Sequence, residues 1–450
     1  MKKTLSLLLS IALLLTLFTG CAKKPAEEPT PAPAASADPA TPVEPAAPSG
    51  EVSQGVTDTE LLIGNAYATS GAWAFVGVPV VDTIQAVIDR FNAEGGIRGR
   101  QVRLIHYDDA YDAAIGKTLI EKLVEEDKVF AISGLGGHVL PACKDYLVDY
   151  GIPVVNIASG LAMGYSENTP GGNLFPVQPS TITDGPQMLA RALHESLFGP
   201  NKDEKLGDDV KLGLMYTNSE AGNDIYTSMM KHAEIEGVTD RMVYEVVSPE
   251  TYASAIQKMK DAGVGLVMYG GGTDTKTLIA AMNDAAWEIP FIGNYGTSTV
   301  QSYSPETYKP TRPIYATTWG DYSTEKAALM LADIDDALTY NQNLDEATRL
   351  AYADNNYARA GYAAALVLVT GLRRLDESGL DLTWENFILC MEQEPVGFGE
   401  AEWSYANGRR MGIETEAFFE YFTVIGADGK PEGAQATLRG FESVEQIMAK

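Results

Sequence analysis

NAEGGIRGRQVRLIHYDD, residues Asn92–Asp109, carries the chain from the end of an amphipathic segment into a short apolar one. The pair Gly95–Gly96 supplies the left-handed backbone conformation in which helices commonly end, and Ile97 can pack the turn onto a core. The next segment, Gln101–Tyr107, is predicted to be a strand. Its carboxyl end brings the pair Asp108–Asp109 to the edge of a sheet, where ligands bind in open α/β folds. We expect these aspartates either to cap the following helix or to contact a ligand.

On both sides of this joint, short apolar segments alternate with amphipathic ones. Such alternation predicts parallel sheets with helices on both faces. A second cycle begins at residue 210 and resembles the first, which predicts two α/β lobes with a ligand cleft between their strand ends. The expected strands are 61–66, 101–107, 129–133, 153–157, 210–216, 241–247, 266–269 and 290–292. The expected helices are 79–94, 113–126, 140–150, 224–236, 252–262 and 276–285.

The N-terminus has the features of an export signal. Lys2 and Lys3 precede the apolar run Leu5–Phe18, which is too short for a membrane-spanning helix and is followed by small residues. The stretch Phe18–Cys21 is similar to the bacterial lipobox, in which the cysteine is lipidated and becomes the new N-terminus. We therefore expect residues 1–20 to be a lipoprotein signal peptide and Cys21 to carry the lipid. Ordinary secretion is the alternative.

Residues 21–53 are expected to form a tether. Between Ala22 and Ser53 the chain has eight prolines among alanine, glutamate and small polar residues, and such a segment cannot bury a core. The roughly 400 residues that follow exceed what one core normally serves, so two lobes are expected. The formal net charge of −28 leaves no basic stripe for phosphate backbones, which argues against a nucleic-acid partner.

The sequence patterns that commonly mark catalysis are incomplete or missing. Gly270–Thr277 departs from a phosphate-binding loop because Thr275 stands where the second glycine is required and Asp274 would repel phosphate. No Gly-x-Ser-x-Gly elbow occurs, and the four histidines show no metal-ligand spacing. We therefore expect a protein that is not an enzyme and that binds neither cofactor nor metal. Cys143 and Cys390 are expected to be buried free thiols, with a disulfide between them as the alternative.

Glycines and aromatic residues follow several of the expected strands. Gly134–Gly137 is a strand-to-helix turn whose backbone N–H groups can bind a carboxylate, and His138 after it either contacts the ligand or caps the helix. Aromatic residues at such positions pack more often than they bind, but several that converge would form a binding box. The aromatic residues expected near the cleft are Trp73, Phe75, Tyr295, Trp319 and Tyr322.

Five segments together resemble one known family. They are GVTDTELLIGNAYATSGAWAFVG from Gly55, FNAEGGIRGRQVRLIHYDD from Phe91, YGIPVVNIASG from Tyr150, FPVQPSTITDG from Phe175 and FFEYFTVIGADGKPEG from Phe418. The chain is similar in them to the solute-binding proteins of ABC importers that have the type I periplasmic-binding-protein fold, in the branched-chain amino acid (leucine/isoleucine/valine-binding) group. The resemblance covers nearly everything after the tether.

The resemblance implies an α/β fold of two Rossmann-like lobes with parallel sheets. Three hinge crossovers would join the lobes, near residues 175–177, 315–322 and 412–416. Lobe one would comprise 54–176 plus 323–412, and lobe two 177–322 plus 413–450. Lobe closure would bury the ligand, and a higher ligand affinity of the closed state would drive it. The closed form would then dock on a membrane permease.

The resemblance also implies how a ligand carboxylate is held. The turn after the third strand and the small residues after the fourth would bind it through backbone donors and the hydroxyl of Ser159. The residues in these two places are Gly136, Gly137, His138, Ala158, Ser159 and Gly160.

Three other positions of the chain correspond to ligand contacts in the family. Ala221 stands where the family commonly has a tyrosine before a glycine. Tyr295 replaces the acidic residue that grips an α-ammonium group, so Asp274 or Glu220 would have to supply the negative charge. Tyr357 falls where the family often places an aromatic ring over the ligand side chain.

The predicted function is capture of a small carboxylate-bearing solute outside the cytoplasmic membrane by a lipid-anchored component of an ABC importer. The ligand is expected to be an amino acid of the branched-chain or hydrophobic type. Because the segment Gln178–Ser180 is similar to that of some binders of aromatic or other hydrophobic carboxylates, such ligands are one alternative, and amides or urea are another. A sensory protein that binds ligand without transport is the alternative function, and an extracellular hydrolase is a further one.

Overall fold

The computed structural model describes residues 49–156, 160–199, 203–271, 275–295, 314–318, 325–353, 355–398, 401–425, 429 and 431–450. The chain divides into two units, Met1–Pro45 and Ala46–Lys450, and all elements below belong to the second. The expected signal peptide, Cys21 and most of the expected tether lie outside the described residues.

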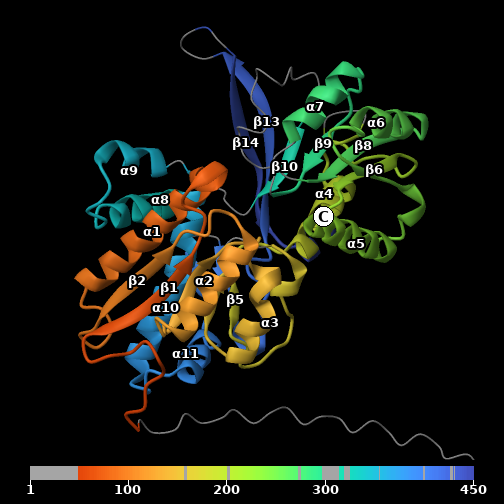
Figure 1. Cartoon of the computed structure of the whole chain (residues 1–450). Helices are drawn as coiled ribbons and strands as arrows, with labels where there is room; N and C mark the ends of the chain where they lie inside the picture. The colour runs from red at the N-terminus through yellow and green to blue at the C-terminus, as the bar shows by residue number, and fades with distance from the viewer. Residues whose placement is uncertain are drawn as a thin grey trace, which may run out of the picture. The chain divides into compact units, whose positions relative to one another are not determined.

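The first sheet has five parallel strands in the order β2-β1-β3-β4-β5 (Figure 1). In β1, Leu61 and Ile63 pack into one hydrophobic core while Leu62 packs against another, because successive side chains of a strand point to opposite faces. The interior strand β1 therefore has helices on both sides. The strands are β1 (Glu60–Ala66), β2 (Gln101–Tyr107), β3 (Ala131–Leu135), β4 (Val154–Asn156) and β5 (Leu174–Pro176).

Helices from two distant parts of the sequence cover the first sheet. One face carries α1, α8, α10 and α11, and the other carries α2 and α3. The helix α1 is long and apolar enough to cross a membrane, but half of its apolar window is buried within the protein. The elements are α1 (Ala74–Ala93), α2 (Ala113–Glu125), α3 (Leu140–Tyr150), α8 (Glu325–Leu338), α9 (Glu346–Ala353), α10 (Asn356–Ser378), α11 (Trp384–Met391), and the hairpin strands β11 (Val396–Phe398) and β12 (Ala401–Trp403).

The helices α1 and α10 cross at a glycine. A Cβ atom on Gly361 would lie 2.5 Å from the carbonyl oxygen of Val80. Only a residue without a side chain lets the two backbones approach so closely. This contact joins a helix that ends at Ala93 to one that begins at Asn356.

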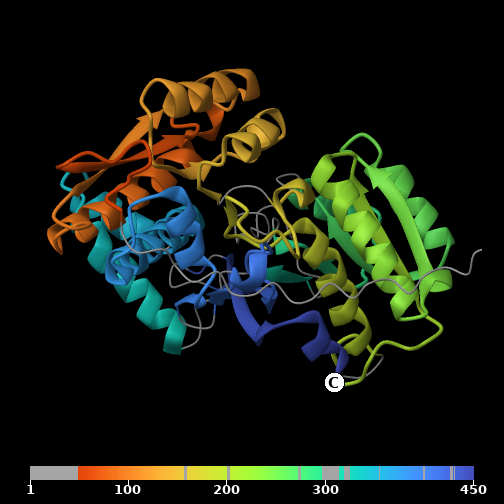
Figure 2. The same cartoon turned by 90° about the horizontal axis from the view of Figure 1, so that it is seen from below.

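The second sheet has seven strands in the order β14-β13-β10-β9-β8-β6-β7 (Figure 2). The strands β6 to β10 pair in parallel, whereas β13 is antiparallel to both β10 and β14. The strands are β6 (Lys211–Thr217), β7 (Met242–Val247), β8 (Val264–Gly270), β9 (Phe291–Gly293), β10 (Ile314–Thr318), β13 (Glu416–Ile425) and β14 (Pro431–Glu442). The helices are α4 (Thr181–His194), α5 (Glu220–Ile235), α6 (Tyr252–Asp261), α7 (Thr275–Asp284) and α12 (Val444–Met448).

The prediction of an α/β fold built on parallel sheets is confirmed. The chain passes between the two sheets after β5, after β10 and again before β13. The helix expected from Pro79 begins earlier, at Ala74. Pro79 therefore lies inside the helix and supplies no N–H for the carbonyl of Phe75, one turn earlier. Cys143 and Cys390 are both buried free thiols, as expected.

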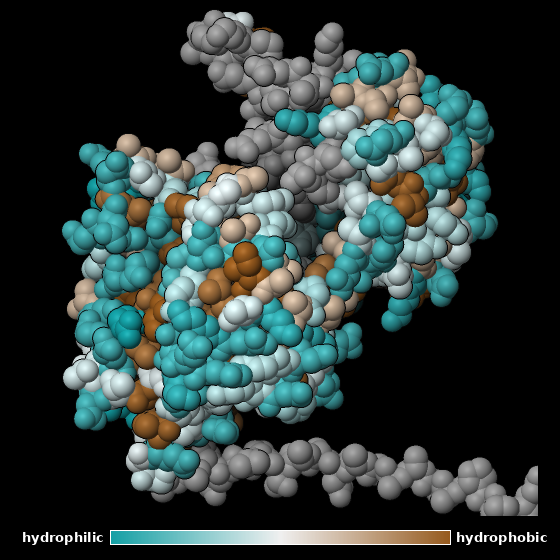
Figure 3. Space-filling model, viewed as in Figure 1, coloured by the Kyte–Doolittle hydropathy of each residue, from teal (hydrophilic) through white to brown (hydrophobic). Residues whose placement is uncertain are grey.

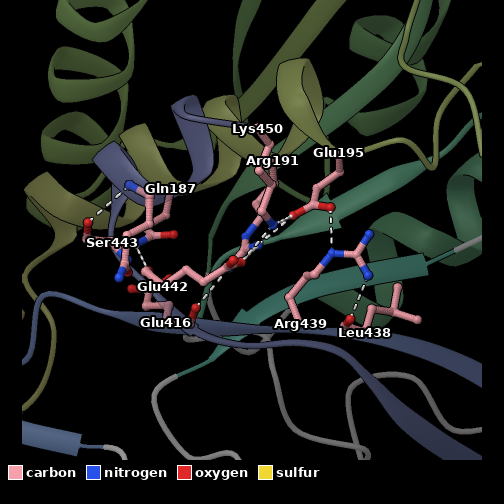
Figure 4. Close-up of polar contacts among 10 residues, drawn as sticks. Gln187, Arg191, Glu195, Glu416, Leu438, Arg439, Glu442, Ser443 and Lys450 are labelled. Atoms are coloured by element: carbon pink, nitrogen blue, oxygen red, sulfur yellow. Dashed lines mark hydrogen bonds and ion pairs between the residues drawn. The ribbon is translucent and has the colours of Figure 1, made fainter.

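An ion network fastens the last strand and helix to α4 (Figure 4). The guanidinium of Arg191, which is fully buried, donates from Nη1 to Glu195 at 2.6 Å and to Glu442 at 2.5 Å. Lys450 donates to the same two carboxylates, at 2.6 and 2.8 Å, and Arg439 donates to Glu195 at 2.8 Å. Buried charges are tolerated when they are paired in this way. The C-terminal segment is therefore held by charge as well as by strand pairing.

The surface seen in Figure 3 is largely hydrophilic, with hydrophobic patches of limited extent. Scattered exposed apolar residues are normal in a soluble protein. A binding surface must therefore be identified from how particular side chains are grouped.

Candidate ligand-binding site

Five aromatic rings form a continuous row beyond the carboxyl ends of β1, β2 and β3. The rings of Trp73 and Tyr111 are stacked with centroids 4.3 Å apart, and the ring of Tyr111 lies 4.1 Å from that of His138. Phe75 continues the row, 5.9 Å from Trp73 and 5.8 Å from Tyr357, which it meets edge to face. The structure thus brings together four residues expected at the site.

The row is open to solvent near its middle. The side chain of Phe75 is 55% exposed and that of Tyr111 is 42% exposed, while Trp73 and Tyr357 are half-buried. Several large rings that are grouped but uncovered are typical of a surface that binds a partner or ligand. Tyr111 is absent from the sequence-based candidates. Its place just after the strand β2 is the signal that would have indicated it.

Tyr111 is presented by a strained turn. Ala110 and Tyr111 both have left-handed backbone conformations, with φ of 50° and 64°, which residues other than glycine rarely adopt. The carboxylate of Asp108 accepts the N–H of Ala110 and that of Asp109 accepts the N–H of Tyr111, both at 2.9 Å. These bonds hold the turn in place, and backbone strain of this kind is common at functional sites.

Neither Asp108 nor Asp109 caps the following helix, because Asp112 does so through bonds from Ala114 and Ile115. Asp108 instead accepts the N–H of Thr69 at 2.9 Å, and so joins the loop after β1 to the loop after β2. The carboxylate of Asp109 is fully buried. The prediction that these two aspartates cap the following helix is therefore wrong.

His138 folds back against the turn that precedes it. A Cβ atom on Gly136 would lie 2.6 Å from Cε1 of the imidazole, so the ring can occupy this place only over a glycine. Nε2 of His138 is 3.1 Å from Oδ2 of Asp109, although neither atom makes a directed hydrogen bond. Since Val139 occupies the N-cap position of α3, His138 does not cap that helix. Partial burial and then the charge of Asp109 raise the pKa of Tyr111, which keeps its phenol neutral.

A partly buried histidine, His106, lies beneath these loops. Nδ1 of His106 lies 2.7 Å from Oδ1 of Asn65, whose amide nitrogen donates to the carbonyl of Ser133 at 2.6 Å. Because that amide oxygen can only accept, His106 carries its proton on Nδ1. Nε2 then accepts from the hydroxyl of Thr69, 3.0 Å away. Burial lowers the pKa of His106, against the opposing charges of the nearby aspartates, so the neutral ring fits this place.

The residues expected after the fourth strand are only partly described. Ala158 and Ser159 lie outside the described residues. The carbonyl of Gly160 accepts from the N–H and the hydroxyl of Thr181, at 2.8 and 2.9 Å. A Cβ atom on Gly160 would lie 2.2 Å from the hydroxyl oxygen of Tyr295. Gly160 therefore lies where the first sheet's loops meet α4, and its carbonyl is occupied there.

Tyr295 follows β9 of the second sheet and contacts this same junction. Its hydroxyl accepts from Nε2 of Gln178 at 2.9 Å. Burial, followed by the charges of Asp184 and Glu416, raises the pKa of Tyr295 above its ordinary value. An acidic residue at this position would add a third carboxyl group to a buried pair. This explains physically why the chain has a neutral ring there.

The start of α5 also reaches the junction. Ala221 and Glu220 lie in its first turn, and Glu220 is exposed. Oδ2 of Asp224, one turn later, accepts from the N–H of Ala162 and the hydroxyl of Thr181, both at 3.0 Å. Asp224 is a carboxylate that the sequence-based candidates omit, and its position one turn after Ala221 is the signal that would have indicated it. Asp274 lies outside the described residues.

Within the described ranges no group of three or more His, Cys, Asp or Glu side chains is arranged to hold a metal ion. At the carboxyl edge of the first sheet, the aromatic row can stack against a flat or apolar group. The glycine turn beside it offers polar backbone groups.

Comparison with known proteins identifies the family to which this chain is similar. Residues 60–432 match the model of a family described as periplasmic binding protein. The "Leu/Ile/Val-binding protein homolog 2" of Brucella abortus is 24% identical over 256 residues, which are 54% of this chain and 62% of that protein. The match thus spans less than two thirds of that relative's length.

Two solved structures share the fold. A "fatty acid ABC transporter substrate-binding protein" from Thermomonospora curvata has a TM-score of 0.64 at 15% identity, covering 88% of this chain and 96% of its own. A "branched chain amino acid ABC transporter" protein from Thermus thermophilus with bound valine has a TM-score of 0.65 at 14% identity, covering 88% and 99%. With a family match that spans most of its length, this chain belongs to the periplasmic binding protein family.

Proposed function

We propose that the protein is the extracytoplasmic, lipid-anchored substrate-binding component of an ABC importer, and that it captures a small carboxylate-bearing solute, an amino acid of the branched-chain or hydrophobic type. The observation that carries the proposal is the exposed aromatic row beside the glycine turn at the carboxyl edge of the first sheet. Membership in the periplasmic binding protein family supports it, as do relatives named for leucine, isoleucine and valine.

In this proposal the ligand lies between the aromatic row and the junction with the second sheet. Backbone N–H groups of Gly137 and His138, together with Ser159, bind the carboxylate. Trp73 and Tyr111 contact the side chain through their exposed rings. A ligand ammonium group requires a negatively charged partner. Asp224, the described carboxylate at the junction, takes this role. Lobe one (54–176 plus 323–412) and lobe two (177–322 plus 413–450) close over the ligand, and the closed form docks on a permease.

A hydrophobic or aromatic carboxylate without an ammonium group is the second candidate ligand. The row from Tyr357 to His138 offers more ring surface than one short branched side chain covers. In addition, Tyr295 offers the ligand a neutral hydroxyl at a position where a ligand ammonium group would need a negatively charged partner. One protein of the same fold is named for fatty acids, and another is described with bound valine.

A thermal-shift panel on the purified chain, first unfolded and refolded to remove carried-over ligand, tests the proposal. A specific ligand stabilises the folded state by mass action and so raises the unfolding temperature. At a ligand concentration of a hundred times its Kd, the apparent stability rises by about 2.7 kcal/mol. We expect branched-chain or other hydrophobic amino acids to stabilise the protein. Stabilisation only by aromatic or fatty carboxylates would select the second candidate. A panel in which no carboxylate, amide or urea acts would contradict both.

The lipid anchor is tested by Cys21→Ser. We expect this variant to leave the membrane fraction and appear in the soluble fraction, because the serine cannot take the lipid that anchors the chain. Fractionation with detection of the protein in each pool measures this, and Cys143→Ser is the matched control because that thiol is buried in the folded body. Membrane association unchanged in Cys21→Ser would contradict the anchor.

A further inference from the structure

Two acidic side chains lie fully buried where the chain passes between the two sheets. Asp184 is in the first turn of α4, just after the first passage, and is 0% exposed. Glu416 begins β13, just after the third passage, and is 1% exposed. Thr317 of β10 precedes the second passage and contacts the same pair. All three passages therefore meet at one point in the fold, and two carboxyl groups occupy it.

The pair has too few hydrogen-bond donors. Oδ1 of Asp184 accepts from the hydroxyl of Thr317 at 2.9 Å and from the N–H of Tyr295 at 3.3 Å. Thr317 also faces Glu416, but its hydroxyl has a single hydrogen. Oδ2 of Asp184 and both carboxyl oxygens of Glu416 are buried without a well-directed hydrogen bond, and the described donors near them are the amide of Asn294 and the hydroxyl of Thr317. Since a buried oxygen without a donor costs free energy, the donor that is missing requires an explanation.

The surrounding charges do not neutralise the pair. Arg191 of α4 is the nearest cation, and its guanidinium donates to the backbone carbonyl of Glu416 at 3.0 Å and not to the carboxyl group. That guanidinium is already shared by Glu195 and Glu442. The other groups that face the pair are the amide of Asn294, the N–H and phenol of Tyr295, and the hydroxyl of Thr317.

Counted together, the network around α4 lacks one positive charge. Four carboxyl groups belong to it, those of Asp184, Glu195, Glu416 and Glu442, and its cations are Arg191, Arg439 and Lys450. One added proton would balance the charges. It would also supply the hydrogen that the unpartnered oxygens lack, because each carboxyl group lies within hydrogen-bonding reach of the other. Two carboxyl groups so close cannot both be ionised without strong repulsion.

We propose that Asp184 and Glu416 form a proton-binding site that holds one shared proton between them at the meeting point of the three passages. Burial raises the pKa of Asp184 to about 7. Burial, and then the charge of Asp184, raise the pKa of Glu416 well above its ordinary value. The site adjoins the ligand contacts of the proposed function through the backbone N–H of Tyr295, but its test requires no ligand.

The sign of the pH dependence follows from these raised pKa values. In the unfolded chain both acids lose their protons near pH 4, whereas the raised pKa values let the folded pair keep at least one proton at higher pH. In that range the folded state binds more protons, so its stability falls as the pH rises. For one proton, the unfolding equilibrium constant rises about tenfold per pH unit across this window.

The test measures urea unfolding of the full chain from pH 5 to pH 8, for the unchanged protein and for Glu416→Gln. The amide donates the hydrogen that Asp184 needs and does not titrate. We expect the dependence on pH to be flatter than that of the unchanged protein by about one proton, a tenfold change per pH unit. Glu420→Gln, on the same strand and partly exposed, is the matched control and should keep the original slope.

Infrared spectroscopy of the unchanged protein gives a second measurement that does not depend on a variant folding. The absorption of a protonated, water-excluded carboxyl group should be present at pH 6, where an exposed carboxyl group is ionised, and it should be weaker in Glu416→Gln. Equal slopes for the unchanged protein and Glu416→Gln, or no such absorption at pH 6, would overturn the proposal. A stabilisation by added Na⁺ or Ca²⁺ that Glu416→Gln abolishes would also overturn it, in favour of a cation in place of the proton.

Discussion

Arg191→Met is expected to destabilise the folded protein by about 3–5 kcal/mol, the largest loss that we predict for a single substitution. Methionine fills a similar volume but leaves Glu195 and Glu442 with fewer cations, and Glu195 is 1% exposed. Removing one partner of a buried ion pair costs far more than the pair contributes, because a charge remains buried without its counterion. Urea unfolding followed by circular dichroism measures the change.

Arg373→Met is the control for this prediction. Arg373 pairs with Glu94, but their side chains are 41% and 50% exposed. An exposed pair contributes about 0–1 kcal/mol because water and salt screen it. A similar loss in the two variants would show that the buried network around α4 has no special role in stability. Loss of the C-terminal segment's protease resistance in Arg191→Met alone would locate the effect at α12.

Tyr111→Ala is expected to weaken binding of whichever ligand the panel identifies by at least about 30-fold, equivalent to 2 kcal/mol or more, as is typical of a central aromatic contact. Tyr111 lies between Trp73 and His138 in the row and contacts both rings. Because its side chain is 42% exposed, the loss should come with little change in unfolding free energy. Titration calorimetry and urea unfolding measure the two quantities separately.

Tyr340→Ala provides the comparison, since Tyr340 is 36% exposed and is not part of the row. Tyr111→Phe keeps the ring and should keep most of the affinity. If Tyr111→Ala binds as tightly as the unchanged protein, the aromatic row is not the ligand surface. If instead it unfolds at a much lower urea concentration, the turn at Ala110 and Tyr111 is a structural element and the affinity loss is indirect.

Much of the fold follows from local sequence patterns. The strand Gln101–Tyr107 has the predicted bounds, and the helix predicted at 113–126 spans Ala113–Glu125. In both, glycines or a capping aspartate mark the boundary, and such signals act over a few residues. No strand is predicted for β13 or β14. The pairing of β13 with β10 depends on residues about a hundred positions apart, and β14 pairs only with β13.

The candidate site is predicted less completely, for a physical reason. The sequence places Trp73, His138 and Tyr357 near strand or helix ends, but their convergence depends on how three loops and α10 pack. Tyr111 and Asp224 are absent from the sequence-based candidates because their signals, a place just after β2 and one turn after Ala221, are shared by many ordinary loop and helix residues. Asp184 and Glu416 are separated by more than two hundred residues, so only tertiary structure shows that they share one buried space.

The crossing of α1 and α10 at Gly361 sets an order on how the polypeptide can acquire its structure during synthesis. The largest hydrophobic core joins residues such as Leu61 and Val80 to residues as late as Ile413. The ribosome must therefore release almost the entire chain before this core can close. Until then the N-terminal half exposes apolar strands and helices that lack their partners. Apolar surface that is exposed in this way makes a nascent chain prone to aggregation.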